Sequence, residues 1–402
     1  MGENVIALAQ RMSLIKPSPT LAVNAKAKQM KADGADILNF SVGEPDFATP
    51  DHVCAAGVKA IEEKFTRYTA VPGIIELRQA ICDRFKEDHG WDYEPDQVQV
   101  SCGGKHGLYN MAQALFGAGD EVLIPTPYWV SYPPIVTLAG ATPVEVPLEE
   151  KDDFDLTAEN LKAFATDKTK GIILNSPSNP TGAVFSEKCL RAVADMALEH
   201  GWIVIVDDIY DTIVYGDYPL PHILDVEPKL KEQVIILNGV SKSFAMTGWR
   251  MGYSLGPKHI IAAMNKIQSQ STSNPSSVAQ RAALAAVSGP QNFPRDMKKS
   301  FQPRMDYIIE EMTSIAGVSC VVPKGAFYVF PNLSAYFGKS FEGQKIEGSV
   351  DMSAYLLEKS FMATVPGAAF GADEFVRFSF AASMDDIKEG MRRLKEALAN
   401  LS

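Results

Sequence analysis

Cysteine is scarce in this chain of 402 residues, and its spacing forms no ligand pattern. The five cysteines are scattered along the sequence, and no two of them form a Cys-x-x-Cys pair. This spacing argues against a structural zinc site and against a disulfide framework. We therefore expect no metal and reduced thiols, as in a cytoplasmic protein.

Long apolar runs and an excess of positive charge are lacking too. No run approaches the roughly 18 apolar residues of a membrane span. Residues 1–12 contain Glu3 and Arg11 where a signal peptide has its apolar core. The net charge of −11 and the pI near 5.2 argue against a nucleic-acid-binding surface. We expect no membrane or nucleic-acid partner, although a local basic pocket for small anions is compatible with this charge.

Short apolar runs alternate with helix-like stretches in the middle of the chain. They cover residues 97–100, 121–124, 171–174, 202–206 and 234–237. Buried apolar strands that alternate with helices are typical of an α/β domain with a mainly parallel sheet. Ligands of such sheets bind at the carboxyl ends of the strands. Gly103, Asn179, Asp207 and Lys242 all follow just past those ends.

The C-terminal third has a different pattern. A long helical pattern begins near Phe293 and continues past Met312, strand-like runs follow at 326–330 and 375–380, and a closing helix begins at about Met384. This order indicates a smaller α+β domain, and the length of the chain suggests two or three domains. We predict an arm with part of the small domain at 1–48, a large domain at 49–292 and a small domain at 293–402.

The most informative stretch is residues 239–252, with the sequence GVSKSFAMTGWRMG. Lys242 lies just after an apolar run among small residues, and Arg250 follows it. A lysine at a strand end can form a Schiff base with a carbonyl, and an arginine can clamp a phosphate. A surface lysine in a polar loop is the plainer alternative. The segment resembles the pyridoxal phosphate attachment segment of class I aminotransferases, which implies that cofactor.

The acidic pair at the end of the run 202–206 gains a role from that cofactor. A carboxylate at the end of an apolar strand is costly unless it is paired, and the protonated ring nitrogen of pyridoxal phosphate would pair with Asp207. Tyr210 could donate to the phenolate oxygen of the ring. The alternative is that Asp207 caps a following helix, or that Asp208 does so.

Two further segments follow predicted strands. Residues 175–182, NSPSNPTG, form a rigid turn in the plainer interpretation, but Asn-Pro-Thr-Gly at this place resembles the family pattern, which makes Asn179 a donor to the phenolate oxygen and a substrate contact. Residues 101–105, SCGGK, open a helix whose amides can bind phosphate. Gly103 and Gly104 would form this cradle with Arg250, and Lys105 adds a positive charge.

Aromatic and basic residues elsewhere complete the resemblance. In residues 127–132, PYWVSY, Trp129 would face cofactor and substrate, although such stretches are more often core. Arg377 is a charge inside the apolar run 375–380, and a buried arginine needs an anion. That anion is either an acidic side chain or the planar α-carboxylate of a substrate, and the resemblance favours the substrate.

The matches extend along nearly the whole chain. The chain is similar to fold-type I, class I aminotransferases and, within them, to the bacterial aspartate aminotransferase subgroup Ib. This subgroup includes enzymes that use prephenate. The resemblance implies that Gly43, in SVGEPDF, lets substrate pass close to the backbone. Tyr68 would reach the cofactor phosphate of a second subunit in a homodimer. Lys16 and Thr20, in KPSPT, would help with a prephenate-like acceptor. Where some relatives have a phosphate-binding hydroxyl this chain has Gly239, so Ser241 or Ser243 would substitute.

The implied reaction moves an amino group between aspartate or glutamate and 2-oxo acids by a ping-pong mechanism. Lys242 would act as general base and acid, Arg377 would hold the α-carboxylate, and Lys105 the distal carboxylate of the substrate. Alternatively, Lys105 only supports the phosphate and Lys16 is a surface residue. A lyase on the same fold is the nearest rival function. A cofactor-sensing transcriptional regulator is a more distant one, since the chain has no basic N-terminal segment.

Overall fold

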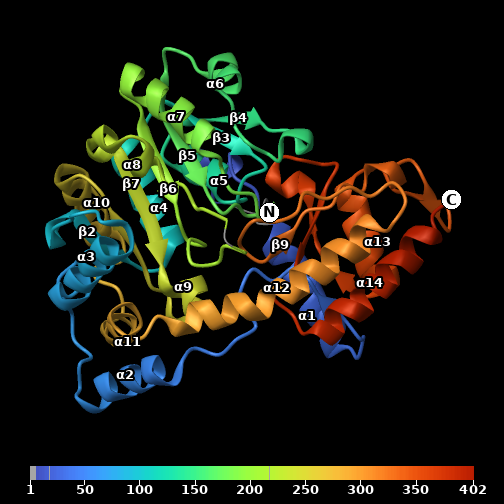
Figure 1. Cartoon of the computed structure of the whole chain (residues 1–402), viewed down its shortest axis with the longest axis horizontal. Coiled ribbons are helices and arrows are strands. Elements are labelled where there is room, and N and C mark those ends of the chain that lie inside the picture. The colour runs from blue at the N-terminus through green and yellow to red at the C-terminus, as the bar shows by residue number, and fades with distance from the viewer. Residues whose placement is uncertain (1–5, 18, 217) are drawn as a thin grey trace, which may run out of the picture.

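The computed structural model describes residues 6–17, 19–216 and 218–402, so Ser18 of the KPSPT segment lies outside the described residues. A seven-stranded sheet forms the centre of the larger part of the molecule (Figure 1). Its spatial order is β2-β8-β7-β6-β5-β3-β4. The strands are β2 (Val98–Ser101), β3 (Glu121–Thr126), β4 (Thr142–Pro147), β5 (Thr169–Asn175), β6 (Ile203–Asp207), β7 (Val234–Gly239) and β8 (Gly252–Leu255).

Strand β8 runs antiparallel to its neighbours β2 and β7, and the other neighbouring pairs are parallel. Successive side chains of a strand point to opposite faces of the sheet. Because these strands are continuously apolar, both faces of the sheet are apolar. In β6, Ile205 packs against α4 (Gly104–Leu115), α5 (Tyr132–Leu138) and α10 (Lys258–Ser271), whereas Val204 and Val206 belong to the cluster on the other face. That second face is covered by α2 (Asp51–Glu62), α3 (Ile75–His89), α7 (Glu187–His200) and α11 (Ser277–Ser288). The predicted α/β class with a mainly parallel sheet is confirmed.

The C-terminal part has its own apolar core and lies beside the large sheet (Figure 1). Helix α12 (Asn292–Thr313) extends from the larger part into it. A three-stranded antiparallel sheet, ordered β13 (Val365–Pro366), β14 (Val376–Ser379), β9 (Tyr328–Val329), packs with α13 (Ser349–Ser360) and α14 (Met384–Ala399). From the N-terminal region, β1 (Leu38–Asn39) pairs with β12 (Met362–Ala363), and α1 (Pro19–Ala32) also lies here. The domain boundaries at 48/49 and 292/293 stay predictions.

Several local elements agree with the sequence patterns and one does not. The long helix near Phe293 and the closing helix from Met384 are present as α12 and α14. The alternative in which Asp207 or Asp208 caps a helix does not hold, because β6 is followed by a turn. Asp208 is buried, and its Oδ2 lies 3.2 Å from His222 Nε2.

Three observations concern membrane spans, disulfide bonds and metal sites. None of the helices in the described ranges has the length and apolar character needed to cross a membrane. The five cysteines are all free. Within the part of the chain that the structure describes, no group of three or more His, Cys, Asp or Glu side chains is arranged to hold a metal ion.

Candidate active site

A cavity of about 350 Å³ lies at the carboxyl ends of β5, β6 and β7, between the large sheet and the C-terminal part. This volume is in the range of small-molecule sites. Most of the residues predicted to form the site line it: Thr20, Gly43, Gly104, Lys105, Trp129, Asn179, Asp207, Tyr210, Ser241, Lys242, Arg250 and Arg377. The cavity therefore brings together side chains that are up to several hundred positions apart in the sequence.

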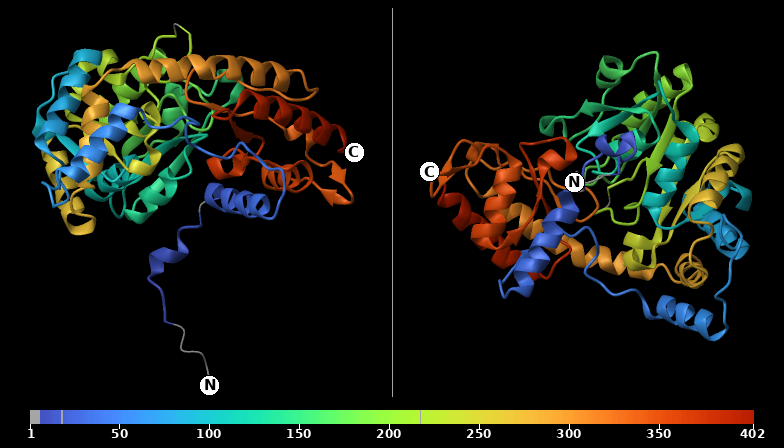
Figure 2. Two further views of the ribbon diagram at one scale, coloured as in Figure 1. Left: turned by 90° about the horizontal axis from the view of Figure 1, so that it is seen from below. Right: turned by 180° about the vertical axis from the view of Figure 1, so that it is seen from behind.

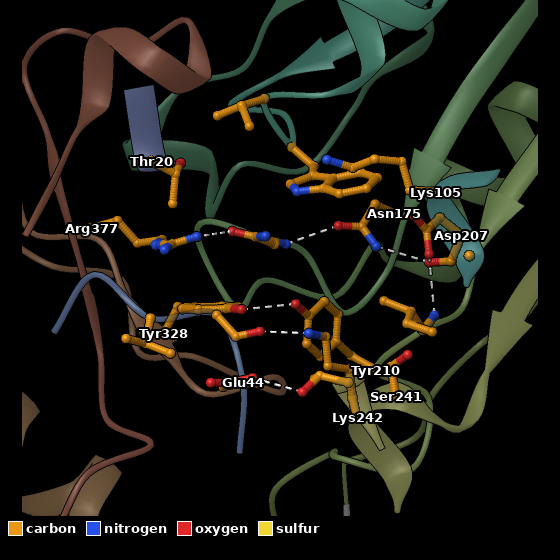
Figure 3. Close-up of a pocket in the computed structure, with 18 of the residues that line it drawn as sticks. Thr20, Glu44, Lys105, Asn175, Asp207, Tyr210, Ser241, Lys242, Tyr328 and Arg377 are labelled. Atoms are coloured by element: carbon orange, nitrogen blue, oxygen red, sulfur yellow. Dashed lines mark hydrogen bonds between the residues drawn. The ribbon is translucent and has the colours of Figure 1, made fainter. Parts of the chain in front are cut away.

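Lys242 lies on the short helix α9 (Val240–Ser243), directly after the last residue of β7. Its side chain points into the cavity (Figure 3), and its Nζ donates a hydrogen bond to the Gly43 carbonyl at 2.5 Å. Burial lowers the pKa of Lys242 to about 8, while the Glu44 carboxylate raises it and the Arg250 charge lowers it further. The amine is thus closer to its neutral, nucleophilic form near pH 7 than an ordinary lysine.

Asp207 is the last residue of β6, and only 4% of its surface is exposed. Its carboxylate oxygens accept hydrogen bonds from neutral donors, Tyr132 Oη at 2.7 Å and the Ile209 amide at 3.3 Å. Burial raises the pKa of Asp207 to about 7, because the two hydrogen bonds do not replace the lost hydration of a charge. A cationic N–H donor from a ligand would remove this penalty.

Arg377 lies in the middle of β14 and is almost completely buried. Its Nη1 donates to Asn179 Oδ1 at 2.9 Å and its Nη2 donates to the Ser41 carbonyl at 2.8 Å. Its Nε has no partner, and no ion pair within the described ranges includes this guanidinium. The expected alternative of an internal salt bridge is therefore not what the structure has. A buried cation held by neutral groups needs an anionic ligand.

Tyrosines support this end of the cavity. The guanidinium of Arg377 lies 4.5 Å from the centre of the Tyr328 ring, and the Tyr328 hydroxyl shares a hydrogen bond with the Tyr210 hydroxyl at 2.9 Å. Both rings are buried, and burial raises the pKa of each phenol. Tyr210 therefore remains a protonated donor at neutral pH.

The opposite end of the cavity has the features of a phosphate cradle. Gly103 has φ of +83° and precedes the first residue of α4, so Gly104 and Lys105 present the free amides of a helix N-terminus. A Cβ atom on Gly103 would lie 2.5 Å from Arg250 Nη2. Glycine thus allows the guanidinium to approach the helix end. Gly103 itself lies behind the cavity wall, next to Arg250.

Of the two serines considered for the phosphate, Ser241 lines the cavity. Ser243 does not line it, and its hydroxyl donates to the Gly239 carbonyl at 3.3 Å. Thr247, which was not predicted, lines the cavity and donates to Glu44 Oε2 at 2.6 Å.

Lys105 and Trp129 both line the cavity, with Lys105 Nζ 4.9 Å from the centre of the indole ring. The surrounding protein and then the Arg250 charge lower the pKa of Lys105. Thr20, from the start of α1, lies across the cavity near Arg377. Lys16 and Tyr68 do not line the cavity in this chain, and 91% of the Tyr68 surface is exposed.

Sequence reasoning missed Tyr132, Asn175 and Tyr328 as site residues. Tyr132 belongs to the quoted PYWVSY segment and Asn175 to NSPSNPTG, but each was read there as part of a local motif only. Tyr328 lies in an apolar run and looked like an ordinary core residue. A polar atom in an apolar run was the one available signal for Tyr328.

The wall of the cavity fits pyridoxal phosphate. A buried carboxylate without a cationic partner suits the protonated ring nitrogen, and a helix N-terminus beside an arginine suits the phosphate. Lys242 lines the same cavity with a lowered pKa, as a lysine that bonds to a carbonyl needs. The free positions of the Arg377 guanidinium suit a carboxylate.

Comparison with known proteins agrees with this chemistry. Residues 35–395 match the sequence model of the family described as aminotransferase class I and II. The chain is 46% identical to an aspartate aminotransferase of Geobacillus stearothermophilus over 96% of this chain and 98% of that protein. It is 45% identical to an aspartate/prephenate aminotransferase of Cereibacter sphaeroides over 98% and 99% of the two chains.

A solved structure supports the same assignment. The fold superimposes on the crystal structure of the aspartate aminotransferase from Rhizobium meliloti with a TM-score of 0.95 and 42% sequence identity. The superposition covers 99% of this chain and 100% of that one. Both the family match and these relatives extend over nearly the full length, so the chain belongs to the class I and II aminotransferase family.

Proposed function

We propose that this aminotransferase acts on dicarboxylic substrates. It would move the amino group between aspartate or glutamate and the 2-oxo acids oxaloacetate and 2-oxoglutarate, with prephenate as a further acceptor. The observation that carries the proposal is Arg377, a buried guanidinium with neutral partners only, facing a cavity whose opposite wall carries Lys105. The names of the relatives support the same substrate class.

The charges of the cavity wall favour anionic ligands. Lys105, Lys242, Arg250 and Arg377 line it, and against them stand the carboxylates of Glu44 and Asp207. This local excess of positive charge contrasts with the net charge of −11 for the whole chain. A cofactor phosphate and two substrate carboxylates would balance it, because buried charges require partners.

The cofactor would be pyridoxal phosphate, which supplies an electron sink for a carbanion at the substrate Cα when bound. Asp207, to which the Tyr132 hydroxyl donates, would pair with its ring nitrogen, and Lys242 would bond to its carbonyl carbon. Asn179 and Tyr210 would donate to its phenolate oxygen. Gly104, Ser241 and Arg250 would hold its phosphate, with Gly103 leaving room for the Arg250 guanidinium, and Trp129 would stack on its ring.

Lys242 would also move the proton at the substrate Cα. Its pKa of about 8 is close to the working pH, as efficient acid and base catalysis requires. Arg377 would orient the α-carboxylate, and Gly43 would let the substrate pass the backbone. Thr20 lines the cavity beside Arg377 and would contact a larger acceptor, and the family resemblance gives the same role to Lys16, which does not line the cavity in this chain.

The test is a donor panel measured on the enzyme and on Lys105→Ala. The wild-type enzyme should exchange amino groups between glutamate and 2-oxo acids, which a lyase would not do. Loss of one charged hydrogen bond should raise KM about 10- to 100-fold for aspartate and glutamate. The KM values for alanine and phenylalanine, which lack a distal carboxylate, should change little.

Lys188→Ala, which removes an exposed lysine on α7 far from the cavity, is the matched control and should leave all the constants unchanged. An equal loss for every donor, together with weaker binding of pyridoxal phosphate, would show that Lys105 serves the phosphate instead.

We further propose that the enzyme is a cytoplasmic homodimer with shared active sites and with the domain boundaries given above. Support for the dimer comes from Tyr68, whose exposed ring cannot reach the cavity of its own chain. Close to Tyr68 in the sequence, α2 and α3 carry three apolar side chains that are more than half exposed: Val58, Ile61 and Ile75. The segment before α1 also projects away from the body with exposed Leu8 and Leu14 (Figure 2). Apolar side chains of this kind favour a protein interface.

A further inference from the structure

One buried amide remains outside the roles given so far. Asn175 is the last residue of β5 and lines the cavity, and only 8% of its surface is exposed. Its Nδ2 donates to the Asp207 carbonyl at 2.9 Å, and its Oδ1 accepts from the Asn179 amide at 2.9 Å. The side chain thus bridges two backbone groups that belong to different segments.

These two bonds join a longer series. Asn179 Oδ1 accepts from Arg377 Nη1 at 2.9 Å. In Figure 3 the dashed lines run from Arg377 through Asn175 to Asp207. The series connects β14, the strand that carries the carboxylate fork, with β6, the strand that carries the buried acid.

The backbone explains why a side chain is needed here. Asn175 stands opposite Asp207 in the parallel pairing of β5 with β6. Strand β5 ends at Asn175, and among the described residues no backbone amide of the following turn bonds to the Asp207 carbonyl. The Asn175 amide supplies a donor to the Asp207 carbonyl and keeps the strand ends in register. Aspartate would lack this donor, and leucine would lack both donor and acceptor.

A purely local role in the turn does not account for these bonds. The turn after β5 is closed by its own backbone, with the Ser178 amide bonded to the Ala183 carbonyl and the Gly182 amide bonded to the Ser178 carbonyl. The donor of Asn175 reaches outside the turn to β6. Its acceptor holds the residue whose side chain orients Arg377.

We propose that Asn175 is a positioning residue that sets the Asn179–Arg377 carboxylate fork relative to Asp207. It acts through Asn179, because both polar atoms of its side chain are already bonded to backbone groups and are not free to bond to substrate or cofactor. The inference rests on the proposed role of Arg377 as the fork for the α-carboxylate. Arg377 has two neutral partners, Asn179 and Ser41, so loss of order in Asn179 frees one edge of the guanidinium plane. Carboxylate binding should then weaken, because a two-bond fork depends on a fixed plane.

The test uses the enzyme loaded with pyridoxal phosphate and the dicarboxylate maleate as the probe, titrated by calorimetry. Asn175→Ala removes both bonds, and loss of the one that holds Asn179 should weaken maleate binding about tenfold, while the dissociation constant of pyridoxal phosphate stays within about twofold. Because Asn175 acts through Asn179, adding Asn175→Ala to Asn179→Ala should cause no further loss. Asn175→Ser, whose shorter hydroxyl cannot span both partners, should behave like Asn175→Ala and is the milder variant for folding.

Asn160→Ala is the control. It removes the side-chain oxygen that accepts from the Thr157 amide at the cap of α6 (Ala158–Phe164), away from the cavity, and should leave maleate binding unchanged. Unchanged maleate binding in Asn175→Ala and Asn175→Ser, additive losses with Asn179→Ala, or an equal weakening of pyridoxal phosphate binding would each overturn the positioning role. Arg377→Ala separates the two claims. If it still binds maleate normally, the proposed fork fails as well, whereas loss of binding there with none at Asn175 refutes the positioning role alone.

Discussion

The buried carboxylate of Asp207 makes a prediction about the cofactor-free protein. With a folded-state pKa raised to about 7, Asp207 keeps its proton in the native state over a pH range in which the unfolded chain has lost it. Between these two pKa values the native state binds more protons than the unfolded state. The free energy of unfolding therefore falls as the pH rises through this window. Asp207→Asn removes the titration and should stabilise the cofactor-free protein at pH 8 but not at pH 4.

The size of this effect follows from the burial of the side chain. The folded-state pKa of about 7 lies roughly 3 pH units above the ordinary value of 3.8, and each unit corresponds to about 1.4 kcal/mol. The upper limit is therefore about 4 kcal/mol. Unfolding entropy near 2.1 cal/mol/K per residue gives about 0.8 kcal/mol/K for 402 residues. The midpoint of thermal unfolding should thus rise by up to about 5 °C at pH 8.

Scanning calorimetry between pH 4 and pH 8.5 measures this difference, and Asp211→Asn is a matched control. Burial also raises the pKa of Asp211 to about 7, and its Oδ2 accepts from Asn238 Nδ2 at 2.7 Å, but it does not line the cavity. Both variants should show the same dependence on pH. Addition of pyridoxal phosphate should stabilise wild type and Asp211→Asn equally, and Asp207→Asn much less.

Two results would refute this reasoning in different ways. A difference between Asp207→Asn and wild type that does not change with pH would mean that the buried carboxylate is not protonated at low pH as argued. Equal stabilisation of all three proteins by the cofactor would mean that Asp207 does not pair with the ring nitrogen.

The remaining predictions concern Lys242 and the dimer. In the cofactor-free protein the rate of acetylation of Lys242, followed by peptide mass spectrometry, should titrate near pH 8. Glu44→Gln should lower this midpoint, because the Glu44 carboxylate raises the pKa of Lys242. A midpoint near 10.5 in both proteins would contradict the effect of burial. Mixing Lys242→Ala with Tyr68→Ala should restore about one quarter of wild-type activity, since half of the randomly formed dimers are hybrids with one intact site; no recovery in a mixture shown by mass to contain hybrids would exclude shared sites.

Much of the fold could be predicted because its central strands are buried on both faces. Continuous apolar runs marked β2, β3, β5, β6 and β7, and each lies within about three residues of its predicted position. The runs missed β4 and β8. Strand β4 is an edge strand with a largely exposed pattern and proline at two positions, and β8 is a four-residue antiparallel strand. Neither has the apolar continuity that marks a central parallel strand, since β4 has the sequence TPVEVP and β8 the sequence GYSL.

The same physical contrast separates the site residues that could be predicted from those that could not. Asp207 and Arg377 are charges within apolar runs, and such a charge conflicts with its local surroundings unless a ligand or partner is present. Asn175 and Tyr132 create no such conflict. An asparagine before Ser-Pro is ordinary turn chemistry, and a tyrosine at the start of a helix is ordinary core. Their roles depend on which strand ends are neighbours, which follows only from the assembled sheet.

The buried charges also explain why the protein carries a stability cost at its cavity. Asp207 and Arg377 are both almost completely buried, face neutral partners and have pKa values displaced by burial in the direction of the uncharged form. A direct ion pair between them would relieve both, but the two side chains form none, and the neutral amides Asn175 and Asn179 lie in the hydrogen-bond series that leads from Arg377 to the Asp207 carbonyl. The neutral amides thus keep one anionic and one cationic group available at opposite ends of the same cavity. A ligand that carries a cationic N–H at one end and a carboxylate at the other would satisfy both at once, and its binding free energy would include the relief of both burial penalties.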